Sequence, residues 1–263
     1  MIPQFITEFE VNILLIVLIL GFLGGLFDNS FGMGYGLLTP IFVFLGFNIS
    51  VIVPTLLLSQ AITGFSGTIF HTINKNVNFS SAENRESKIY LLFTATGIIG
   101  TIIAVVFVIT LFDLFILLYI GLMMIIVGII VLFKVNFNGN WKKLYSISVI
   151  AGFNKAISGG GYGPLVTCGQ LMSGGKVRNS VGVTQFSEST ISILSFLLYF
   201  ILHDFVQIWL TIQLSIIMVL SGMFSAPIGA MVARKLDEEI ARKTVALLSI
   251  TLGTITLLRI MCL

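Results

Sequence analysis

The chain has 263 residues, of which 14 are Lys or Arg and 11 are Asp or Glu. Hydrophobic residues make up 57 % of the sequence, and the mean hydropathy is +1.08. Soluble domains carry about 25 % charged residues because water must wet their surface, whereas this chain carries 10 %. The composition excludes a soluble globular protein, a nucleic-acid binder and a disordered chain, and it indicates that a lipid bilayer surrounds most of the surface.

Ten apolar stretches divide the chain, five before a polar linker at 134–143 and five after it. A transmembrane helix needs about 20 mostly apolar residues, and the second stretch of each half is too short to span comfortably. The stretches lie at 11–31, 35–47, 49–73, 89–111, 114–133, 144–158, 162–173, 180–202, 206–233 and 244–262. We predict an all-α polytopic membrane protein, with a first repeat at 1–133 and a second at 144–263. Residues 1–10 contain no basic residue, so we expect no cleavable signal peptide.

The two halves resemble each other in sequence. Residues 25–36 (GLFDNSFGMGYG) align with residues 152–163 (GFNKAISGGGYG), an offset of 127 residues from Gly36 to Gly163. Ser59-Gln60 aligns with Ser187-Glu188 at an offset of 128 residues. A repeat of about half the chain is typical of secondary transporters.

Basic residues predict how the segments cross the membrane. Nearly all of them lie in four connections, 74–88, 134–143, 174–179 and 234–243, and cytoplasmic loops collect Lys and Arg. With these connections inside, the first two stretches must return to the outer face, and the sixth and seventh must return to the inner face. We therefore predict two inverted repeats of five segments, each starting with a Gly-rich broken or re-entrant helical hairpin, and both termini outside.

Each half contains a glycine cluster before its short stretch. Glycine costs about 1 kcal/mol relative to Ala inside a helix, and non-helical backbone at membrane depth must be buried or line a cavity. Each cluster predicts an unwound turn followed by a helix start, whose unpaired N–H groups attract anions. The alternative is that the glycines only permit close helix packing. The expected substrate-binding residues are Asn29, Gly32, Gly34, Tyr35, Gly36, Gln60, Asn154, Lys155, Ser158, Gly159, Gly160, Gly161, Tyr162, Gly163 and Thr184.

Three ionisable residues interrupt the apolar stretches: Asp28, Lys155 and Glu188. A charge at the bilayer centre costs at least about 2.5–3.5 kcal/mol, so it usually has a partner or a function. Asp28 and Lys155 occupy equivalent positions, and near a pseudo-two-fold axis they would approach each other. Lys155 then either attracts the anion, with Asp28 as its resting partner or a proton acceptor, or forms a permanent ion pair. Glu188 is the expected proton carrier, against the alternative of a protonated side chain that joins two helices.

The motifs of the second half resemble those of the TauE/SafE family of sulfite exporters. The similarity runs from Ser158-Gly159-Gly160-Gly161-Tyr162-Gly163-Pro164 to Ser180-Val181-Gly182-Val183-Thr184, and Phe31–Gly36 is a looser match. The resemblance implies an inner (plasma) membrane carrier of sulfite, sulfonates or related small anions. Met33 replaces a glycine of the denser run, and Gln60 stands where the other half has Glu188.

Several other functions compete with this interpretation. Gly34-Tyr35-Gly36 and Gly161-Tyr162-Gly163 both match the end of a potassium-channel filter, but hairpins from opposite faces would not surround one axis. An intramembrane enzyme needs clustered acid–base or metal groups, and a structural subunit has little use for buried charges. The two cysteines, Cys168 and Cys262, form no CxxC, so we expect no metal site and no cofactor. The expected partners are a small anion and the lipid bilayer, with no nucleic acid, and self-association is left open.

Overall fold

The structure is a computed structural model that describes residues 11–108, 113–133, 141–202, 207–235 and 237–261. The described residues form ten helices and no strand. The linker residues 134–140 and the chain ends at 1–10 and 262–263 lie outside the described residues, so the expected positions of the termini concern residues that are not described. The prediction of an all-α protein is confirmed.

Each of the predicted apolar stretches coincides with one helix. The helices are α1 (Val11–Phe31), α2 (Gly34–Phe44), α3 (Ile49–Ile73), α4 (Arg85–Val108), α5 (Asp113–Leu132), α6 (Trp141–Ser158), α7 (Tyr162–Met172), α8 (Val177–Leu202), α9 (Ile208–Lys235) and α10 (Glu238–Met261). Within the described residues, α1, α3, α4, α5, α8 and α9 are long and apolar enough to cross a membrane. Helices α2 and α7 have 11 residues each, which is too short to span the hydrocarbon core.

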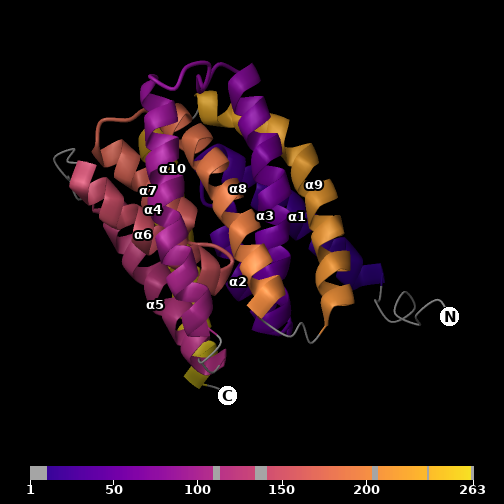
Figure 1. Ribbon diagram of the computed structural model, residues 1–263. Coiled ribbons are helices and arrows are strands. Elements are labelled where there is room, and N and C mark those ends of the chain that lie inside the picture. The colour runs from indigo at the N-terminus through magenta and orange to yellow at the C-terminus, as the bar shows by residue number, and fades with distance from the viewer. Residues whose placement is uncertain (1–10, 109–112, 134–140, 203–206, 236, 262–263) are drawn as a thin grey trace.

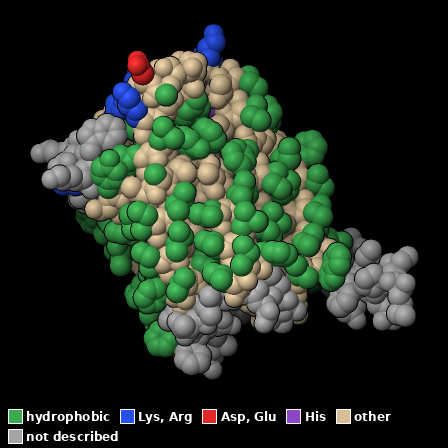
Figure 2. All heavy atoms as spheres, in the orientation of Figure 1, with side chains coloured by type: hydrophobic (Ala, Val, Ile, Leu, Met, Phe, Trp, Pro, Cys, Tyr) green, Lys and Arg blue, Asp and Glu red, His purple; other side chains and the backbone are tan. Residues whose placement is uncertain are grey.

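The molecule is apolar outside and polar at its centre. Exposed Leu, Ile and Phe side chains lie on the outer faces of the long helices, and hydrophobic side chains cover most of the face that Figure 2 shows, with charged side chains gathered at its upper end. At the centre, buried polar side chains come from α1, α3, α6 and α8. This distribution suits a protein whose solvent is lipid, because the buried polar groups find partners inside the protein.

Helices from the two halves pack in equivalent pairs. Helix α1 lies along α9, and its counterpart α6 lies along α4. The remaining main pairs join a helix to its own counterpart, α3 to α8 and α5 to α10. In Figure 1 these long helices stand side by side, and the α3–α4 connection and the end of α9 lie at the upper end.

Glycines set the limits of the two short helices. Gly32, before α2, has a φ of +74°, and Gly159, before α7, has a φ of +71°. After the helices, Gly46 (φ +95°) and Gly174 (φ +80°) are again left-handed. A left-handed residue ends or breaks a helix, and glycine takes this conformation without a steric penalty. The glycine clusters therefore isolate two short helices at corresponding places in the halves.

Candidate functional site

The two turns that precede the short helices meet at the centre of the protein. We call residues 32–33 the first glycine turn and residues 159–161 the second glycine turn. A Cβ atom on Gly36 would lie 2.9 Å from the backbone nitrogen of Gly161, and one on Gly160 would lie 2.7 Å from the nitrogen of Gly36. Thr39 also donates a hydrogen bond to the carbonyl of Ser158 at 2.5 Å. The backbones thus touch in a way that only glycine permits, and α2 and α7 begin side by side.

The space beside this contact is almost closed. A cavity next to the two turns, lined in part by Met33, Met123 and Pro164, has a volume of about 10 Å³. A water molecule needs roughly 10–15 Å³ of such volume. This cavity therefore has no room for an anion larger than water in this conformation.

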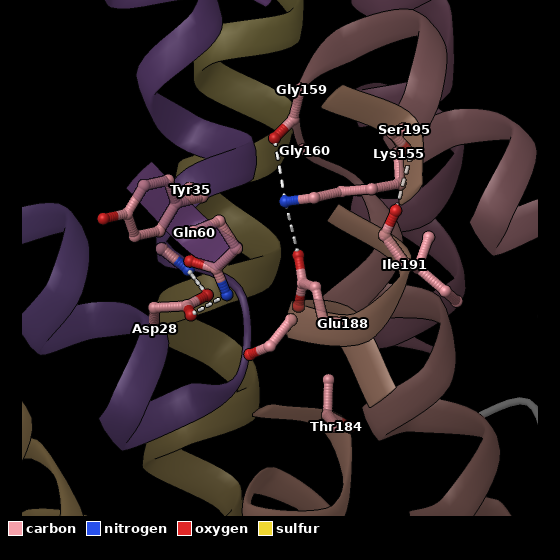
Figure 3. A network of polar contacts seen from close by, with 12 residues as sticks. Asp28, Tyr35, Gln60, Lys155, Gly159, Gly160, Thr184, Glu188, Ile191 and Ser195 are labelled. Atoms are coloured by element: carbon pink, nitrogen blue, oxygen red, sulfur yellow. Dashed lines mark hydrogen bonds and ion pairs between the residues drawn. The ribbon is translucent and has the colours of Figure 1, made fainter. Parts of the chain in front are cut away.

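A buried ion pair lies beside the second glycine turn. Lys155, near the end of α6, is 0 % exposed, and Glu188, near the middle of α8, is 2 % exposed. The Lys155 Nζ atom lies 2.9 Å from Glu188 Oε1 and donates a second hydrogen bond to the Gly159 carbonyl at 2.9 Å. It also lies 5.8 Å from the centre of the Tyr35 ring. Figure 3 shows Lys155 with its bonds to Glu188 and Gly159. The cation is therefore fixed between the two short helices.

A carboxylate with three donors lies beside the first glycine turn. Asp28 Oδ2 accepts hydrogen bonds from the amides of Gln60 and Gln185, each at 2.7 Å. Its Oδ1 atom accepts from the backbone N–H of Gly34 at 2.9 Å. Asp28 is 1 % exposed, so amide donors replace the water that a carboxylate would otherwise require. Gln185 adds a further bond to the Asp28 carbonyl at 2.8 Å.

The two polar clusters occupy corresponding positions. Asp28 of α1 contacts Gln60 of α3, and their counterparts in the second half, Lys155 of α6 and Glu188 of α8, contact each other. Figure 3 shows the two pairs next to each other. In each half, a side chain of the first helix thus contacts a side chain of the third helix. The contact joins an acid and an amide in the first half, and a cation and an acid in the second half.

Each short helix also begins next to a carboxylate. The first N–H of α2 donates to Asp28, as described above. At the start of α7, Glu188 Oε2 lies 3.3 Å from the position that a Cβ atom on Gly163 would take. This oxygen has no hydrogen-bond partner among the described residues. Helix N-termini carry partial positive charge and favour anions. Asp28 accepts a hydrogen bond from the start of α2, whereas Glu188 Oε2 lies beside the start of α7 without such a bond among the described residues.

The expectation that Asp28 serves as the partner of Lys155 is corrected by these contacts. Lys155 forms its ion pair with Glu188, and Asp28 is held by amides, with no ion pair to any described residue. The cause is tertiary packing. Helix α8 packs between the two hairpins and places Glu188 next to the Lys155 ammonium. Lys155 is also fully buried.

The other expected site residues divide into two groups. Tyr35 is buried with its hydroxyl 2.9 Å from Thr63 Oγ1, and the ring of Tyr162 is fully buried near Phe93. Thr184 lies one turn before Glu188 and bonds Thr167 at 3.0 Å. These three residues lie around the turns.

Asn29 and Asn154 form side-chain hydrogen bonds with groups outside the two turns. The Asn29 amide donates to the Gly25 carbonyl at 2.8 Å, and its side chain packs against Gly67 of α3 and Gly229 of α9. Asn154 accepts a hydrogen bond from Tyr119 of α5. Ser158 bonds the Asn154 carbonyl at 2.7 Å and so stabilises the end of α6. Ser158 Oγ also donates to the Gly160 carbonyl at 2.9 Å and accepts from the Gly160 N–H at 3.2 Å, so it holds the second glycine turn in place.

Gln185 is the central residue that the sequence did not identify. Its two bonds to Asp28 join α8 to α1 across the two halves. The available signal was an amide in the middle of an apolar stretch, the same signal that singled out Gln60. Groups of three or more His, Cys, Asp or Glu side chains with metal-binding spacing do not occur in the part of the chain that the structure describes.

Comparison with known proteins identifies the family. The family described as "Sulfite exporter TauE/SafE" matches residues 17–255, which is nearly the whole chain and includes both glycine turns. The chain belongs to the sulfite exporter TauE/SafE family. A curated relative, the "Probable membrane transporter protein YtnM" of Bacillus subtilis (strain 168), is 26 % identical over 243 residues, covering 86 % of this chain and 77 % of that protein. No solved structure matches the chain.

Membership in the TauE/SafE family places the buried charges inside a membrane transporter. The family is one of membrane transporters, and several helices of this chain are long and apolar enough to cross a membrane. The resemblance that the glycine clusters indicated is therefore confirmed. The Asp28 and Lys155–Glu188 clusters lie inside the matched residues, at the centre of a TauE/SafE transporter.

Proposed function

We propose that this protein is a secondary transporter, and specifically an exporter, of sulfite or a related small sulfur-containing anion such as an organosulfonate. The anion binds between the two glycine turns near the middle of the membrane, and its movement is coupled to a proton carried by Glu188. The observation that carries the proposal is the fully buried Lys155 ammonium, which is bonded to the second glycine turn and pairs with one carboxylate, Glu188, among the described residues.

The ion pair suggests how a proton and an anion are linked. A proton on Glu188 removes its negative charge, so Lys155 loses its paired carboxylate. A small oxyanion then replaces the Glu188 carboxylate, with Lys155 as its cation and the N–H groups at 161–163 as donors. Gly161 provides no side-chain cap for these N–H groups, which leaves them available to a ligand. The start of α2 is already bonded to Asp28, so α7 is the main anion-binding end.

The helix pairing supports the inverted repeat that this mechanism requires. The α1–α9 and α4–α6 pairs, and the self-paired α3–α8 and α5–α10, are the contacts that a pseudo-two-fold axis would generate. Transporters built from such repeats bind substrate at the repeat interface, next to broken helices. Asp28 and Lys155 come from the equivalent helices α1 and α6, as this interpretation expects.

We further propose that the end of the molecule with the basic connections faces the cytoplasm, in a cell inner membrane. Arg85 at the start of α4 donates to the Ser173 carbonyl at 3.0 Å, and Asn179 at the start of α8 bonds Glu86 at 2.8 Å. These contacts join the basic connections 74–88 and 174–179 at one end of the protein. A single basic end agrees with the preference of Lys and Arg for the cytoplasmic side.

Flux of ³⁵S-labelled sulfite into proteoliposomes, with and without an imposed pH gradient, tests the proposal. The wild-type protein should give saturable flux that the gradient increases. Lys155→Met should abolish the flux, because the only buried cation at the site is removed. Glu188→Gln should carry flux that no longer responds to the gradient, because the Gln amide cannot bind and release a proton as the Glu188 carboxyl does.

Two controls separate these effects from loss of folding. Lys243→Met removes a cation of similar type from an exposed pair with Glu239 and should leave the flux unchanged. The double variant Lys155→Met/Glu188→Gln removes both buried charges together and should fold but not transport. Wild-type flux in Lys155→Met would contradict the anion-binding role, and an unchanged pH response in Glu188→Gln would contradict the coupling role.

A further inference from the structure

A cavity opens at the basic end of the protein, apart from the glycine turns. It has a volume of about 250 Å³, far more than the roughly 10–15 Å³ that one water molecule needs. Its walls come from the starts of α4, α6 and α8, the end of α7, and the turn at 173–176 between α7 and α8. The cavity is therefore large enough for a small oxyanion together with water.

Positive charge predominates in the walls of this cavity. Arg85, Lys176 and Arg178 line it, against a single carboxylate, that of Glu86. Glu86 already accepts a hydrogen bond from Asn179. Within the described ranges, neither Lys176 nor Arg178 forms an ion pair. A cleft lined by one sign of charge concentrates ions of the opposite sign, so this cavity favours anions.

A buried hydroxyl without a partner also lines the cavity. Ser180 is 1 % exposed, and its Oγ atom has no hydrogen-bond partner among the described residues. A buried polar group normally makes a hydrogen bond. An oxyanion or a water molecule in the cavity would supply the acceptor that this hydroxyl lacks.

Polar side chains continue from the cavity toward the glycine turns. Gln170 and Val183 are among the lining residues of the cavity. The Gln170 amide donates to the Ser180 carbonyl at 3.2 Å and to Thr184 Oγ1 at 3.1 Å. Thr184 in turn bonds Thr167.

The last of these side chains reaches the first glycine turn. A Cβ atom on Gly32 would lie 2.5 Å from Thr167 Oγ1. Glu188 lies one helical turn beyond Thr184 on α8. The Gln170 side chain thus links the cavity lining to Thr184, which lies one turn from the central ion pair.

We propose that this cavity is a vestibule that collects a small oxyanion for the central site. Lys176 and Arg178 attract the anion, and Gln170 is the gate between the vestibule and the central site. This inference rests on the proposed transport of an anion, which it extends to the route by which the anion arrives. The vestibule opens at the basic end, so it serves the cytoplasmic side and matches an exporter that loads its substrate there.

The first test compares sulfite kinetics in vesicles of phosphatidylcholine, which contain no anionic lipid headgroup. Sulfite is presented on the side of the 174–179 connection. Lys176→Gln/Arg178→Gln should raise KM by about tenfold, because a charged cleft raises local ion concentration and on-rate by about that factor or more. It should leave kcat within about twofold and lose its effect at high ionic strength. The matched control Lys88→Gln/Lys235→Gln removes two exposed cations that do not line the cavity and should leave KM unchanged.

The second test measures the electrostatic preference of the vestibule by thiol labelling, which requires no transport. Ser173→Cys places a thiol in the lining of a protein whose Cys168 and Cys262 are replaced by Ala. The anionic reagent 2-sulfonatoethyl methanethiosulfonate should label this thiol faster than its trimethylammonium counterpart, and Lys176→Gln/Arg178→Gln should abolish that preference. Equal KM changes in the two double variants, or equal labelling rates with the two reagents, would overturn the vestibule. If the wild-type protein carries no sulfite, the proposed substrate fails, and the labelling rates still decide the inference.

Discussion

Removing one member of the Lys155–Glu188 pair should destabilise the protein far more than removing both. At the observed 2.9 Å separation, the attraction is about 6 kcal/mol for an effective dielectric constant of about 20. Desolvation costs several kcal/mol per buried ion, so the net contribution of the intact pair is small. A single substitution leaves the other charge buried and uncompensated, which costs about 3–5 kcal/mol.

The assay is a double-mutant cycle on the free energy of unfolding, measured by denaturant titration in detergent micelles. Lys155→Met and Glu188→Gln should each lose about 3–5 kcal/mol, and the double variant should lose about 2 kcal/mol or less. The exposed Lys243–Glu239 pair, with side chains 59 % and 55 % exposed, provides the matched cycle. Its coupling energy should be about 0.5 kcal/mol or less.

Two outcomes would refute the reasoning. If the two single substitutions were additive in the double variant, the side chains would not be coupled as a buried pair. If the double variant were stable and also transported at the wild-type rate, the ion pair would be only structural, and the anion would bind elsewhere. A stable double variant without flux separates the stabilising role of the pair from its role in transport.

Other contacts at the centre give further predictions. Gly160→Ala should lose about 3 kcal/mol or more, because its Cβ would overlap the backbone of Tyr35 and Gly36 at the start of α2. Gly169→Ala inside α7 should change stability by less than about 1 kcal/mol, and denaturant titration of both variants compares them. Gln185→Leu should lower stability by about 2–3 kcal/mol, since Asp28 loses a donor while its carboxylate stays buried; an unchanged melting temperature would contradict this. Thr39→Val keeps the side-chain shape but removes the bond to the second glycine turn, so it should cost about 1 kcal/mol, measured by the same titration, and no loss would mean that the bond contributes nothing.

The helices of this protein follow closely from local sequence. Apolar runs long enough to cross a membrane predicted the long helices, and the glycine clusters predicted where helices break. The end of α1 at Phe31 and the start of α2 at Gly34 lie where the sequence predicted an unwound turn. These features depend on residues that are neighbours along the chain, so propensity and hydropathy determine them.

The partners of the buried charges did not follow from local sequence. Asp28 was expected to serve as the partner of Lys155 because the two are equivalent in the repeat, yet Lys155 pairs with Glu188. Glu188 itself was recognised as a buried carboxylate, but its distance from α6 depends on how α8 packs. Gln185 was overlooked because an amide has no charge to mark it, although its two bonds to Asp28 join the halves.

The sequence alone therefore determined the class of the protein, the positions of its helices and the three buried ionisable residues. The tertiary structure decided which of these residues touch, that the two glycine turns are in backbone contact, and that a basic cavity lies at one end. The physical reason is the distance along the chain over which each interaction acts. Hydropathy and helix propensity act within a few turns of the chain, whereas an ion pair between α6 and α8 depends on how separate helices pack.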